Sequence, residues 1–203
     1  MNVVIVDYGM GNIHSLIGAL RYIGVQNVTV SDQYQVLKNA DKLILPGVGA
    51  FYKAMQSIKE KKLDQSLYDL VINNYKPILG ICLGMQLMCL SSTEQGEHAG
   101  LGFIKGTVRR LNDNKTRIPH VGFNQVLVDD HLKLYRDMTG QIDFYFTHSF
   151  KAETDFPINQ CHCHYGDAFI ASYEADHIAG VQFHPELSQK NGLKLLKNFV
   201  EHF

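Results

Sequence analysis

Residues 77–86, PILGICLGMQ, place a cysteine between two glycines that follow a short apolar run. The run predicts a buried parallel strand, and the residues after Cys82 predict a helix. Glycine at positions 80 and 84 allows a tight strand-to-helix turn, because neighbouring backbone can approach where no side chain stands. Such a turn lifts Cys82 out of the sheet edge and directs the positive end of the helix dipole at its sulfur. The alternative is a glycine pair at a helix start beside a core cysteine.

The segments before this turn alternate strands with helices. Apolar, β-branched runs at 3–8, 28–30 and 42–47 predict strands, and the residues between them repeat apolar positions at helical spacing. That order implies a parallel sheet with right-handed crossovers. Apolar stripes mark two of the predicted helices, namely Ile13, Leu16, Ile17 and Leu20 in one and Phe51, Ala54, Met55 and Ile58 in the other.

After about residue 100 the pattern changes to strands separated by turn residues. We predict that a helix continues from the cysteine turn through 83–90, and that another closes the chain with Ser188 as its N-cap. The fold class is therefore α/β, and residues 1–203 form one domain with a mixed, mostly parallel central sheet flanked by helices. The runs that we interpret as antiparallel additions to the same sheet are 106–111, 124–128, 143–150, 160–165, 168–174 and 178–185.

Length and composition exclude several classes of protein. In 203 residues, 19 Lys and Arg nearly balance 20 Asp and Glu, which argues against a nucleic-acid or membrane-surface binder. No apolar run approaches the ~20 residues of a membrane span, and the first residues lack a basic signal-peptide region, so we expect a cytoplasmic location. The four cysteines are expected to stay reduced. In CHCHY, 161–165, cysteines and histidines would point to opposite faces of a strand, so we expect no metal and no cofactor.

A second candidate for chemistry is GVQFHPE, residues 180–186. His184 ends an apolar strand, where the sites of α/β proteins gather. Pro185 holds an extended backbone, so His184 and Glu186 can project to the same side. A carboxylate there can hold one imidazole nitrogen while the other faces the sulfur, as a cysteine nucleophile requires. The alternative is a surface His and Glu after a strand, and the Cys82 turn favours the catalytic interpretation.

A third segment, LILPGVGAF at residues 43–51, is a glycine-rich loop after a strand. Gly47 and Gly49 leave backbone N–H groups free to turn toward an anion. Together with the N–H of Leu83 in the cysteine turn, this loop would supply the two donors of an oxyanion hole. A plain glycine turn before a helix is the alternative.

Three of these segments, in this order, resemble the class I, or triad, glutamine amidotransferase family: PGVGAF at 46–51, GICLGMQ at 80–86 and GVQFHPE at 180–186. Within that family, further segments are similar to the glutaminase subunits of imidazole glycerol phosphate synthases: DYGMGN at 7–12, RIPHVGFN at 117–124 and YFTHSF at 145–150. The resemblance covers nearly the whole chain. It implies a flavodoxin-like core and hydrolysis of L-glutamine.

The resemblance also implies roles for individual residues. Cys82 would attack the side-chain amide of glutamine, His184 would protonate the departing ammonia and later activate water, and Glu186 would orient His184. The carboxylate of Glu94 would meet the α-ammonium of the substrate. The oxyanion hole would be made by Val48, Gly49 and Leu83, and the glutamine pocket would be lined by Gln86, Glu94, His148, Ser149 and Phe150.

A partner is implied as well. Ammonia would pass to a (β/α)₈-barrel cyclase subunit in a heterodimer, which makes imidazole glycerol phosphate and an aminoimidazole carboxamide ribonucleotide in histidine biosynthesis. Activity would stay low until the cyclase is liganded, because the Val48–Gly49 peptide would face the wrong way until then. Two of the implied interface positions depart from the family, which often has Trp where this chain has Phe123 and Lys where it has Leu187. The implied interface residues are Asn12, Pro119, His120, Phe123 and Leu187.

Other functions stay open from the sequence alone. VVIVDYGMGN at 3–12, with Asp32 after the second strand, partly matches a dinucleotide-binding fingerprint, but His14 stands in place of the third glycine. Asp7 also lies where phosphates would approach. The chain could also be the glutaminase of another ammonia-using synthase or a free-standing cysteine hydrolase, and the segments DYGMGN and PHVGFN argue against both.

Overall fold

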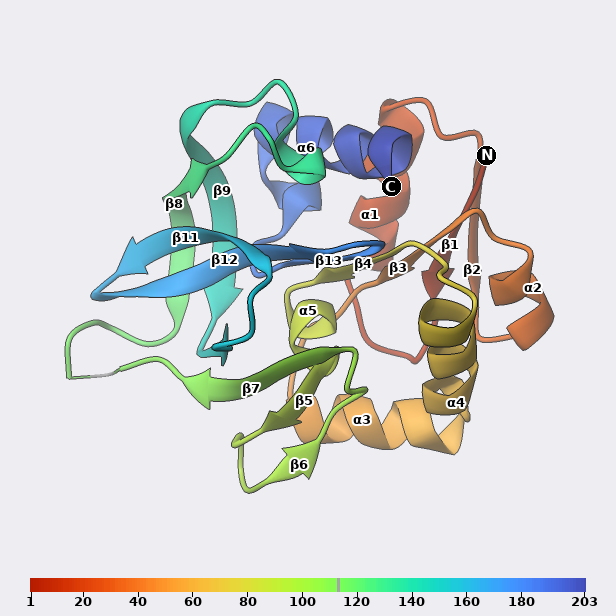
Figure 1. The fold of residues 1–203 in the computed structure, drawn as a ribbon, viewed down its shortest axis with the longest axis horizontal. Helices are drawn as coiled ribbons and strands as arrows, with labels where there is room; N and C mark the ends of the chain where they lie inside the picture. The colour runs from red at the N-terminus through yellow and green to blue at the C-terminus, as the bar shows by residue number, and fades with distance from the viewer. Residues whose placement is uncertain (113) are drawn as a thin grey trace.

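A mixed β-sheet runs through the centre of the molecule. The computed structural model describes residues 1–112 and 114–203, and within them nine strands form this sheet (Figure 1). Pairings are parallel from β2 to β13 and antiparallel from β13 to β9, so parallel pairings make up half of the sheet rather than most of it. The predicted α/β class with a mixed sheet is confirmed. In spatial order the strands are β2 (Asn27–Ser31), β1 (Asn2–Val6), β3 (Lys42–Leu45), β4 (Ile78–Ile81), β13 (Ile178–Val181), β12 (Asp167–Ala175), β11 (Asn159–Tyr165), β8 (His120–Val128) and β9 (Gly140–His148).

The parallel half of the sheet has a flavodoxin-like strand order. Its strands β2, β1, β3, β4 and β13 follow the 2-1-3-4-5 pattern of that fold. In such sheets, ligands bind beyond the carboxyl ends of the strands, next to the point where the strand order reverses. That point lies between β1 and β3, so the loops after β1, β3, β4 and β13 emerge at the edge where a site is expected.

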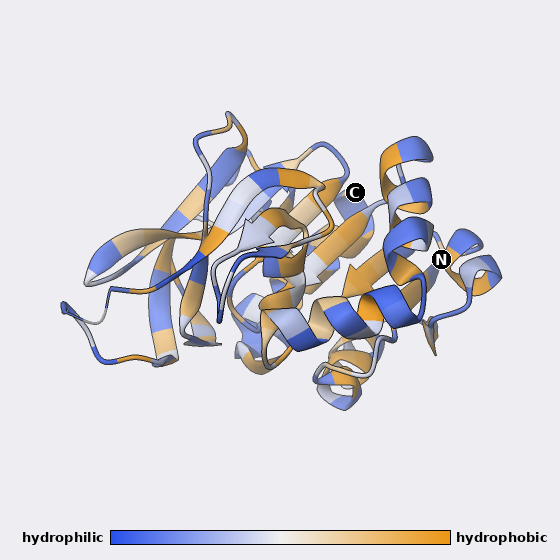
Figure 2. Ribbon diagram, turned by 90° about the horizontal axis from the view of Figure 1, so that it is seen from below, coloured by the Kyte–Doolittle hydropathy of each residue, from blue (hydrophilic) through white to orange (hydrophobic). Residues whose placement is uncertain are grey.

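Helices cover both faces of the sheet (Figure 1). On one side lie α1 (Ile13–Tyr22) and α6 (Gln189–His202), and on the other lie α3 (Phe51–Glu60), α4 (Leu63–Leu67) and the π-helix η1 (Tyr68–Asn73). Alternating side chains of β1 divide between two cores, with Val3 and Ile5 facing α1 and Val4 and Val6 facing α3. Figure 2 accordingly shows hydrophobic strands enclosed by helices with polar outer faces. The short helix α2 (Tyr34–Lys38) lies in the connection from β2 to β3.

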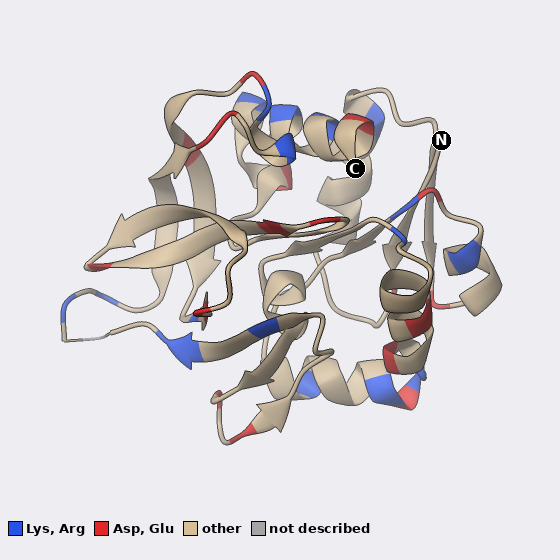
Figure 3. Cartoon of the chain, in the orientation of Figure 1, with Lys and Arg blue, Asp and Glu red and all other residues tan. Residues whose placement is uncertain are grey.

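Charged side chains lie mostly on the outer helices and the loops, where both signs are interspersed (Figure 3). This distribution agrees with the near balance of acidic and basic residues in the sequence. Among the helices of residues 1–112 and 114–203, none is both long enough and apolar enough to cross a membrane.

A second sheet of four strands corrects two predictions. Its order is β10 (Phe150–Glu153), β7 (Ile104–Arg110), β5 (Cys89–Ser92) and β6 (His98–Ala99). The prediction that 106–111 joins the central sheet is wrong, because β7 pairs with β5 and β10. The predicted helix 83–90 is too long, because α5 ends at Leu87 and Cys89 starts β5 by pairing with Ile104. Pairing with a distant strand therefore overrides the local helical pattern.

The cysteines and histidines of β11 alternate between its two faces. Cys161 and Cys163 are buried, whereas His162 and His164 are exposed, as the strand interpretation predicted. All four cysteines of the chain are free thiols.

The last helix begins where the sequence predicts. Two 3-10 helices complete the elements, η2 (Lys133–Tyr135) and η3 (Pro185–Leu187), and α6 starts directly after Ser188. Ser188 is the N-cap residue of α6, as predicted, but its hydroxyl makes no cap hydrogen bond. That hydroxyl instead accepts from the Tyr145 N–H and donates to the His184 carbonyl.

We expect Gly84→Ala to destabilise the fold severely. A β-carbon at position 84 would lie 1.8 Å from the carbonyl oxygen of Leu45, so either β3 or the cysteine turn must move. Overpacking of this kind should lower the free energy of unfolding by more than about 2 kcal/mol, as measured by urea denaturation.

Gly18→Ala is the matched control, because Gly18 is exposed within α1 and an added β-carbon would meet nothing within 4 Å. This substitution should raise the free energy of unfolding by about 0.5–1 kcal/mol. Similar effects of the two substitutions would contradict the close approach of the turn to β3.

Candidate active site

One cavity of about 420 Å³ lies at the carboxyl edge of the parallel strands. It brings together segments that are far apart in the sequence, from the loops after β3, β4 and β13 to the end of β9. All residues predicted for the oxyanion hole and the glutamine pocket line it, and Glu186 lies behind His184. The lining residues are Val48, Gly49, Cys82, Leu83, Gln86, Glu94, Pro119, Thr147, His148, Ser149, Phe150 and His184.

Cys82 occupies a strained turn between β4 and α5. Its backbone has φ 52° and ψ −109°, a conformation that costs a residue with a side chain about 1–3 kcal/mol. A hydrogen bond of 2.7 Å from its N–H to the Val181 carbonyl holds the turn against β13. The strain has a geometric result, because it turns the sulfur into the cavity at the start of α5. Cys82 therefore lies in the tight strand-to-helix turn that the sequence predicts, with its side chain at the cavity.

His184 is held by hydrogen bonds at both its backbone and its ring. The His184 N–H donates to the Tyr145 carbonyl at 2.8 Å, and its own carbonyl accepts from Ser188 Oγ at 2.6 Å. Imidazole Nδ1 lies 2.9 Å from Glu186 Oε1, and both side chains are 3% exposed. The buried carboxylate fixes Nδ1 as the protonated nitrogen, which leaves Nε2 to exchange protons with a substrate.

The electrostatics of this pair favour a protonated imidazole. Burial lowers the pKa of His184, but its interactions with Cys82 and Glu186 outweigh that effect and raise the pKa to about 10. His184 Nε2 is buried and has no hydrogen-bond partner among the described residues. A charged imidazolium aimed into the cavity can protonate a leaving amine.

A buried glutamine pair adjoins the sulfur, and the sequence interpretation assigned no role to one of its members. Gln182 is fully buried, and its Nε2 lies 3.7 Å from Cys82 Sγ. Its Oε1 accepts a 2.9 Å hydrogen bond from Gln86 Nε2, which also donates to the Phe150 carbonyl. A glutamine inside the apolar run AGVQF was a signal for such a role, because a buried amide requires partners.

Glu94 connects the cavity with the start of a helix. Its Oε2 accepts a 2.8 Å hydrogen bond from the N–H of Phe51, the first residue of α3. The hydrogen bonds made by described residues use only this oxygen of the carboxylate, and the residue lines the cavity. Glu94 can therefore cap α3 and still face a cation in the pocket.

The loop after β3 packs tightly against the cysteine turn. A β-carbon on Gly47 would lie 2.7 Å from the backbone nitrogen of Gly84, so only glycine fits there. Gly49 has φ 101°, a conformation that disfavours other residues, and Val48 is 40% exposed. The loop thus brings the Val48–Gly49 peptide to the cavity mouth, opposite the N-terminal end of α5.

The predicted interface residues divide into surface and buried positions. Phe123 is half exposed on β8, next to Val121 and Leu127 on the same face, and Leu187 is exposed beside the triad. His120 does not join this face, because it is 3% exposed and alternation along β8 points it inward. The other two predicted positions are Pro119, which lines the cavity, and Asn12, whose Nδ2 lies 3.5 Å from Glu186 Oε1.

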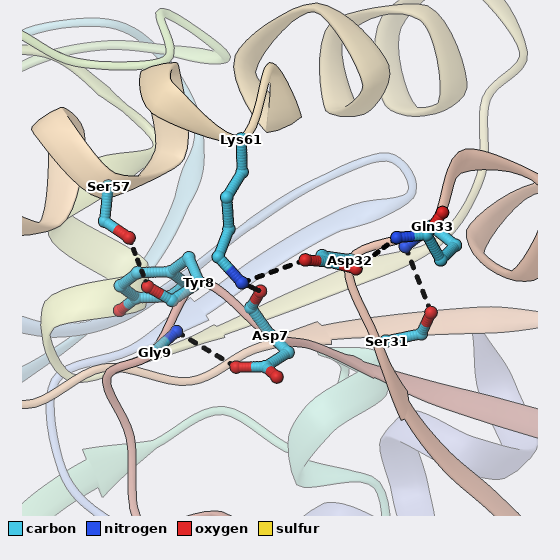
Figure 4. Close-up of polar contacts among 8 residues, drawn as sticks. All are labelled: Asp7, Tyr8, Gly9, Ser31, Asp32, Gln33, Ser57 and Lys61. Atoms are coloured by element: carbon cyan, nitrogen blue, oxygen red, sulfur yellow. Dashed lines mark hydrogen bonds and ion pairs between the residues drawn. The ribbon is translucent and has the colours of Figure 1, made fainter.

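The loop after β1, which partly matches a dinucleotide fingerprint, is occupied by contacts of its own (Figure 4). Lys61 Nζ pairs with Asp32 Oδ2 at 2.9 Å and also donates to the Asp7 carbonyl. The other oxygen of Asp32 accepts from Gln33 Nε2. Both oxygens of the Asp32 carboxylate, which would bind a ribose in a dinucleotide site, are thus already engaged. The helix that follows this loop, α1, packs against η3, which carries Glu186.

We expect the stability of the protein to depend on the His184 proton. Because the folded-state pKa of His184 is raised from 6.5 to about 10, its stabilising contribution is full below pH 6.5 and is lost as the pH rises through 10. Urea denaturation should show a larger fall in unfolding free energy over this range for the wild type than for His184→Gln. The exposed His131 provides the control variant His131→Gln, which should follow the wild type. Parallel pH profiles for wild type and His184→Gln would contradict the raised pKa.

Comparisons with known proteins agree with this geometry. The family model "Glutamine amidotransferase class-I" matches residues 4–203. Imidazole glycerol phosphate synthase subunit HisH 1 of Campylobacter jejuni (strain RM1221) is 42% identical over 98% of each chain. The HisH subunit of Aquifex aeolicus (strain VF5) is 44% identical over 98% of this chain and 96% of its own.

Solved structures support the fold at lower identity. The structure of PurLQS from Thermotoga maritima gives a TM-score of 0.75 at 18% identity, covering 99% of this chain and 98% of that one. A glutamine amidotransferase from Thermotoga maritima gives 0.67 at 16% identity, covering 99% and 96%. With the cavity and its Cys82, His184 and Glu186 in place, the chain belongs to the class I glutamine amidotransferase family, and within it to the HisH subunits of imidazole glycerol phosphate synthase.

Proposed function

We propose that this chain hydrolyses L-glutamine to glutamate and ammonia and delivers the ammonia to the cyclase subunit of an imidazole glycerol phosphate synthase. The observation that carries the proposal is the convergence of Cys82 with the hydrogen-bonded pair His184–Glu186 at one cavity. A nucleophile, a base and an orienting carboxylate in that arrangement are the parts of an acyl-transfer site. All of residues 1–203 would serve as this one glutaminase domain.

In the proposed reaction, the Cys82 sulfur attacks the side-chain carbonyl carbon of glutamine, and its electron pair forms a tetrahedral intermediate. The negative oxygen is stabilised by the N–H of Leu83 and by the Val48–Gly49 peptide. The C–N bond breaks as His184 gives its proton to the nitrogen, so ammonia leaves and a thioester remains. Neutral His184 then takes a proton from water, which attacks the thioester, and glutamate departs as the thiol is regenerated.

The pocket residues would bind the rest of glutamine. The carboxylate of Glu94 would pair with the α-ammonium, as its free oxygen and its place in the cavity support. Polar groups of the other lining residues would orient the amide and the α-carboxylate. These residues are Gln86, His148, Ser149 and Phe150.

The partner would be a cyclase subunit with a (β/α)₈ barrel, bound as a heterodimer in the cytoplasm. Relatives of this chain are named subunits of imidazole glycerol phosphate synthase, which favours this synthase over another ammonia-using one. The exposed apolar side chains of Val121, Phe123 and Leu127 support a protein contact on β8. Leu187 cannot form the ion pair that a lysine would form there, so contact at this position would be apolar.

Activation by the partner would act on the oxyanion loop. The Val48–Gly49 peptide lies at the cavity mouth, and Gly49 permits a peptide rotation that a β-carbon would hinder. A liganded cyclase would thus switch on hydrolysis by turning one N–H toward the developing oxyanion, so that ammonia forms only when it can be used.

We expect Cys82→Ser, in complex with the cyclase subunit, to lose glutamine-dependent synthesis by roughly 10³-fold or more. Synthesis from added ammonia should be unchanged, because the substitution removes only the glutaminase nucleophile. Loss of both activities would contradict a purely glutaminase role.

A diazo-oxo-norleucine probe should label Cys82 and spare Cys89, whose burial raises its thiol pKa to about 12.

We expect two substitutions of Glu94 to separate its two contacts. Glu94→Gln keeps an acceptor for the Phe51 N–H but loses the charge, so KM for glutamine should rise about tenfold with little change in stability. Glu94→Ala should raise KM similarly and also lower the unfolding free energy by about 1 kcal/mol, because α3 loses its cap. An unchanged KM in Glu94→Gln would contradict binding of the α-ammonium by this carboxylate.

A further inference from the structure

A chain of hydrogen bonds runs from the inner face of β8 to the cavity. Asn124 Nδ2 lies 3.3 Å from His120 Nε2, and His120 Nδ1 lies 3.0 Å from His148 Nε2. His148 Nδ1 in turn lies 2.8 Å from the Phe150 carbonyl oxygen. His120 and His148 are directly opposite in the pairing of β8 with β9, which brings their rings into contact.

The direction of this chain is fixed independently from both ends. At one end, the Gln125 N–H donates to Asn124 Oδ1 at 2.8 Å, and Asn124 Nδ2 donates to the His164 carbonyl at 3.0 Å. The amide of Asn124 therefore has one orientation, and its remaining N–H can only donate to His120. His120 must then carry its proton on Nδ1 and donate to His148.

The other end leads to the same assignment. The Phe150 carbonyl can only accept, so His148 carries its proton on Nδ1 and presents a bare Nε2 to His120. Burial lowers the pKa of His120 to about 4 and that of His148 to about 3, so both rings are neutral near pH 7. With neutral rings, each imidazole nitrogen has one partner of the required kind, and the hydrogen bonds from Asn124 to His120, from His120 to His148 and from His148 to Phe150 all run in one direction, toward the cavity.

The chain ends on groups next to the reacting sulfur. The Phe150 carbonyl also accepts a 2.9 Å hydrogen bond from Gln86 Nε2. Gln86 Nε2 donates as well to Gln182 Oε1, and Gln182 Nε2 lies 3.7 Å from Cys82 Sγ. His148 and Gln86, two residues that line the cavity, thus share the Phe150 carbonyl as acceptor.

We propose that Asn124 and His120 are positioning residues for glutamine hydrolysis, which fix the tautomer and orientation of His148 through this one-way chain of hydrogen bonds. The inference rests on the proposed function, because it assigns these hydrogen bonds to the glutamine pocket. It is a role separate from packing, although His120 also stacks between Tyr165 and Phe146 at ring distances of 4.0 and 4.8 Å.

Two substitutions of His120 distinguish positioning from packing. His120→Phe keeps an aromatic ring between Tyr165 and Phe146 but removes the donor to His148. His120→Asn loses the ring but can place an amide N–H where Nδ1 was. In the complex, we expect His120→Phe to raise KM for glutamine about tenfold with a smaller change in kcat, and His120→Asn to lie closer to the wild type. The reverse order, or no change in either variant, would overturn the proposal.

Imidazole ¹⁵N spectra of the full-length protein report which ring nitrogen of each histidine carries the proton, a property that a purely packing role of His120 would not determine. The wild type should show His120 and His148 both protonated on Nδ1. Asn124→Asp replaces the donor to His120 by an acceptor, so His120 should gain a proton on Nε2, while Asn124→Ser, which retains a donor, should leave the wild-type pattern. A wild-type His148 protonated on Nε2 would overturn the proposal.

The two sets of measurements also separate this proposal from the proposed function. If the complex hydrolyses no glutamine, the proposed function fails, whereas the tautomers still report on the chain of hydrogen bonds. If glutamine is hydrolysed and the His120 variants match the wild type, only the positioning role fails.

Discussion

Close contact between backbone segments at the carboxyl edge of the parallel strands is the constraint on which the site depends. A β-carbon on Gly84 would meet the Leu45 carbonyl at 1.8 Å, one on Gly47 would meet the Gly84 nitrogen at 2.7 Å, and one on Gly180 would meet the Tyr173 ring at 2.5 Å. Without side chains at these positions, β3, the cysteine turn and β13 can meet at one cavity. The strain of about 1–3 kcal/mol at Cys82 is then offset by the packing of the segments around it.

The antiparallel half of the sheet completes a site that the parallel half begins. His184 follows the parallel strand β13, yet its backbone N–H is bonded to Tyr145 of β9 and its carbonyl to Ser188. His148 reaches the cavity from the end of the same strand β9. The position of the His184 imidazole is therefore determined by strands that a flavodoxin-like core lacks, and the cavity lies where the two halves meet.

The features predicted correctly from the sequence are those encoded within a few residues. The turn around Cys82 and the segment that carries His184 and Glu186 each contain their own glycine, proline and strand signals. The errors arose where distant partners override local preference: Cys89 leaves the helix to pair with β7, and β7 joins the second sheet instead of the central one. The contact between His120 and His148 depends on the register of β8 with β9, which no local pattern specifies.

Within the pair His184–Glu186, one hydrogen bond joins Nδ1 to Oε1, and the other nitrogen and the other oxygen stay without a partner among the described residues. These two atoms, His184 Nε2 and Glu186 Oε2, are both buried. In the proposed reaction, a permanent partner on Nε2 would compete with the substrate nitrogen for this atom. Glu186 is held only weakly beyond His184, because Asn12 approaches it at 3.5 Å, at the outer limit of a hydrogen bond. Asn12 immediately precedes α1, so any contact that moved the start of this helix closer would strengthen the hold of the carboxylate on the imidazole.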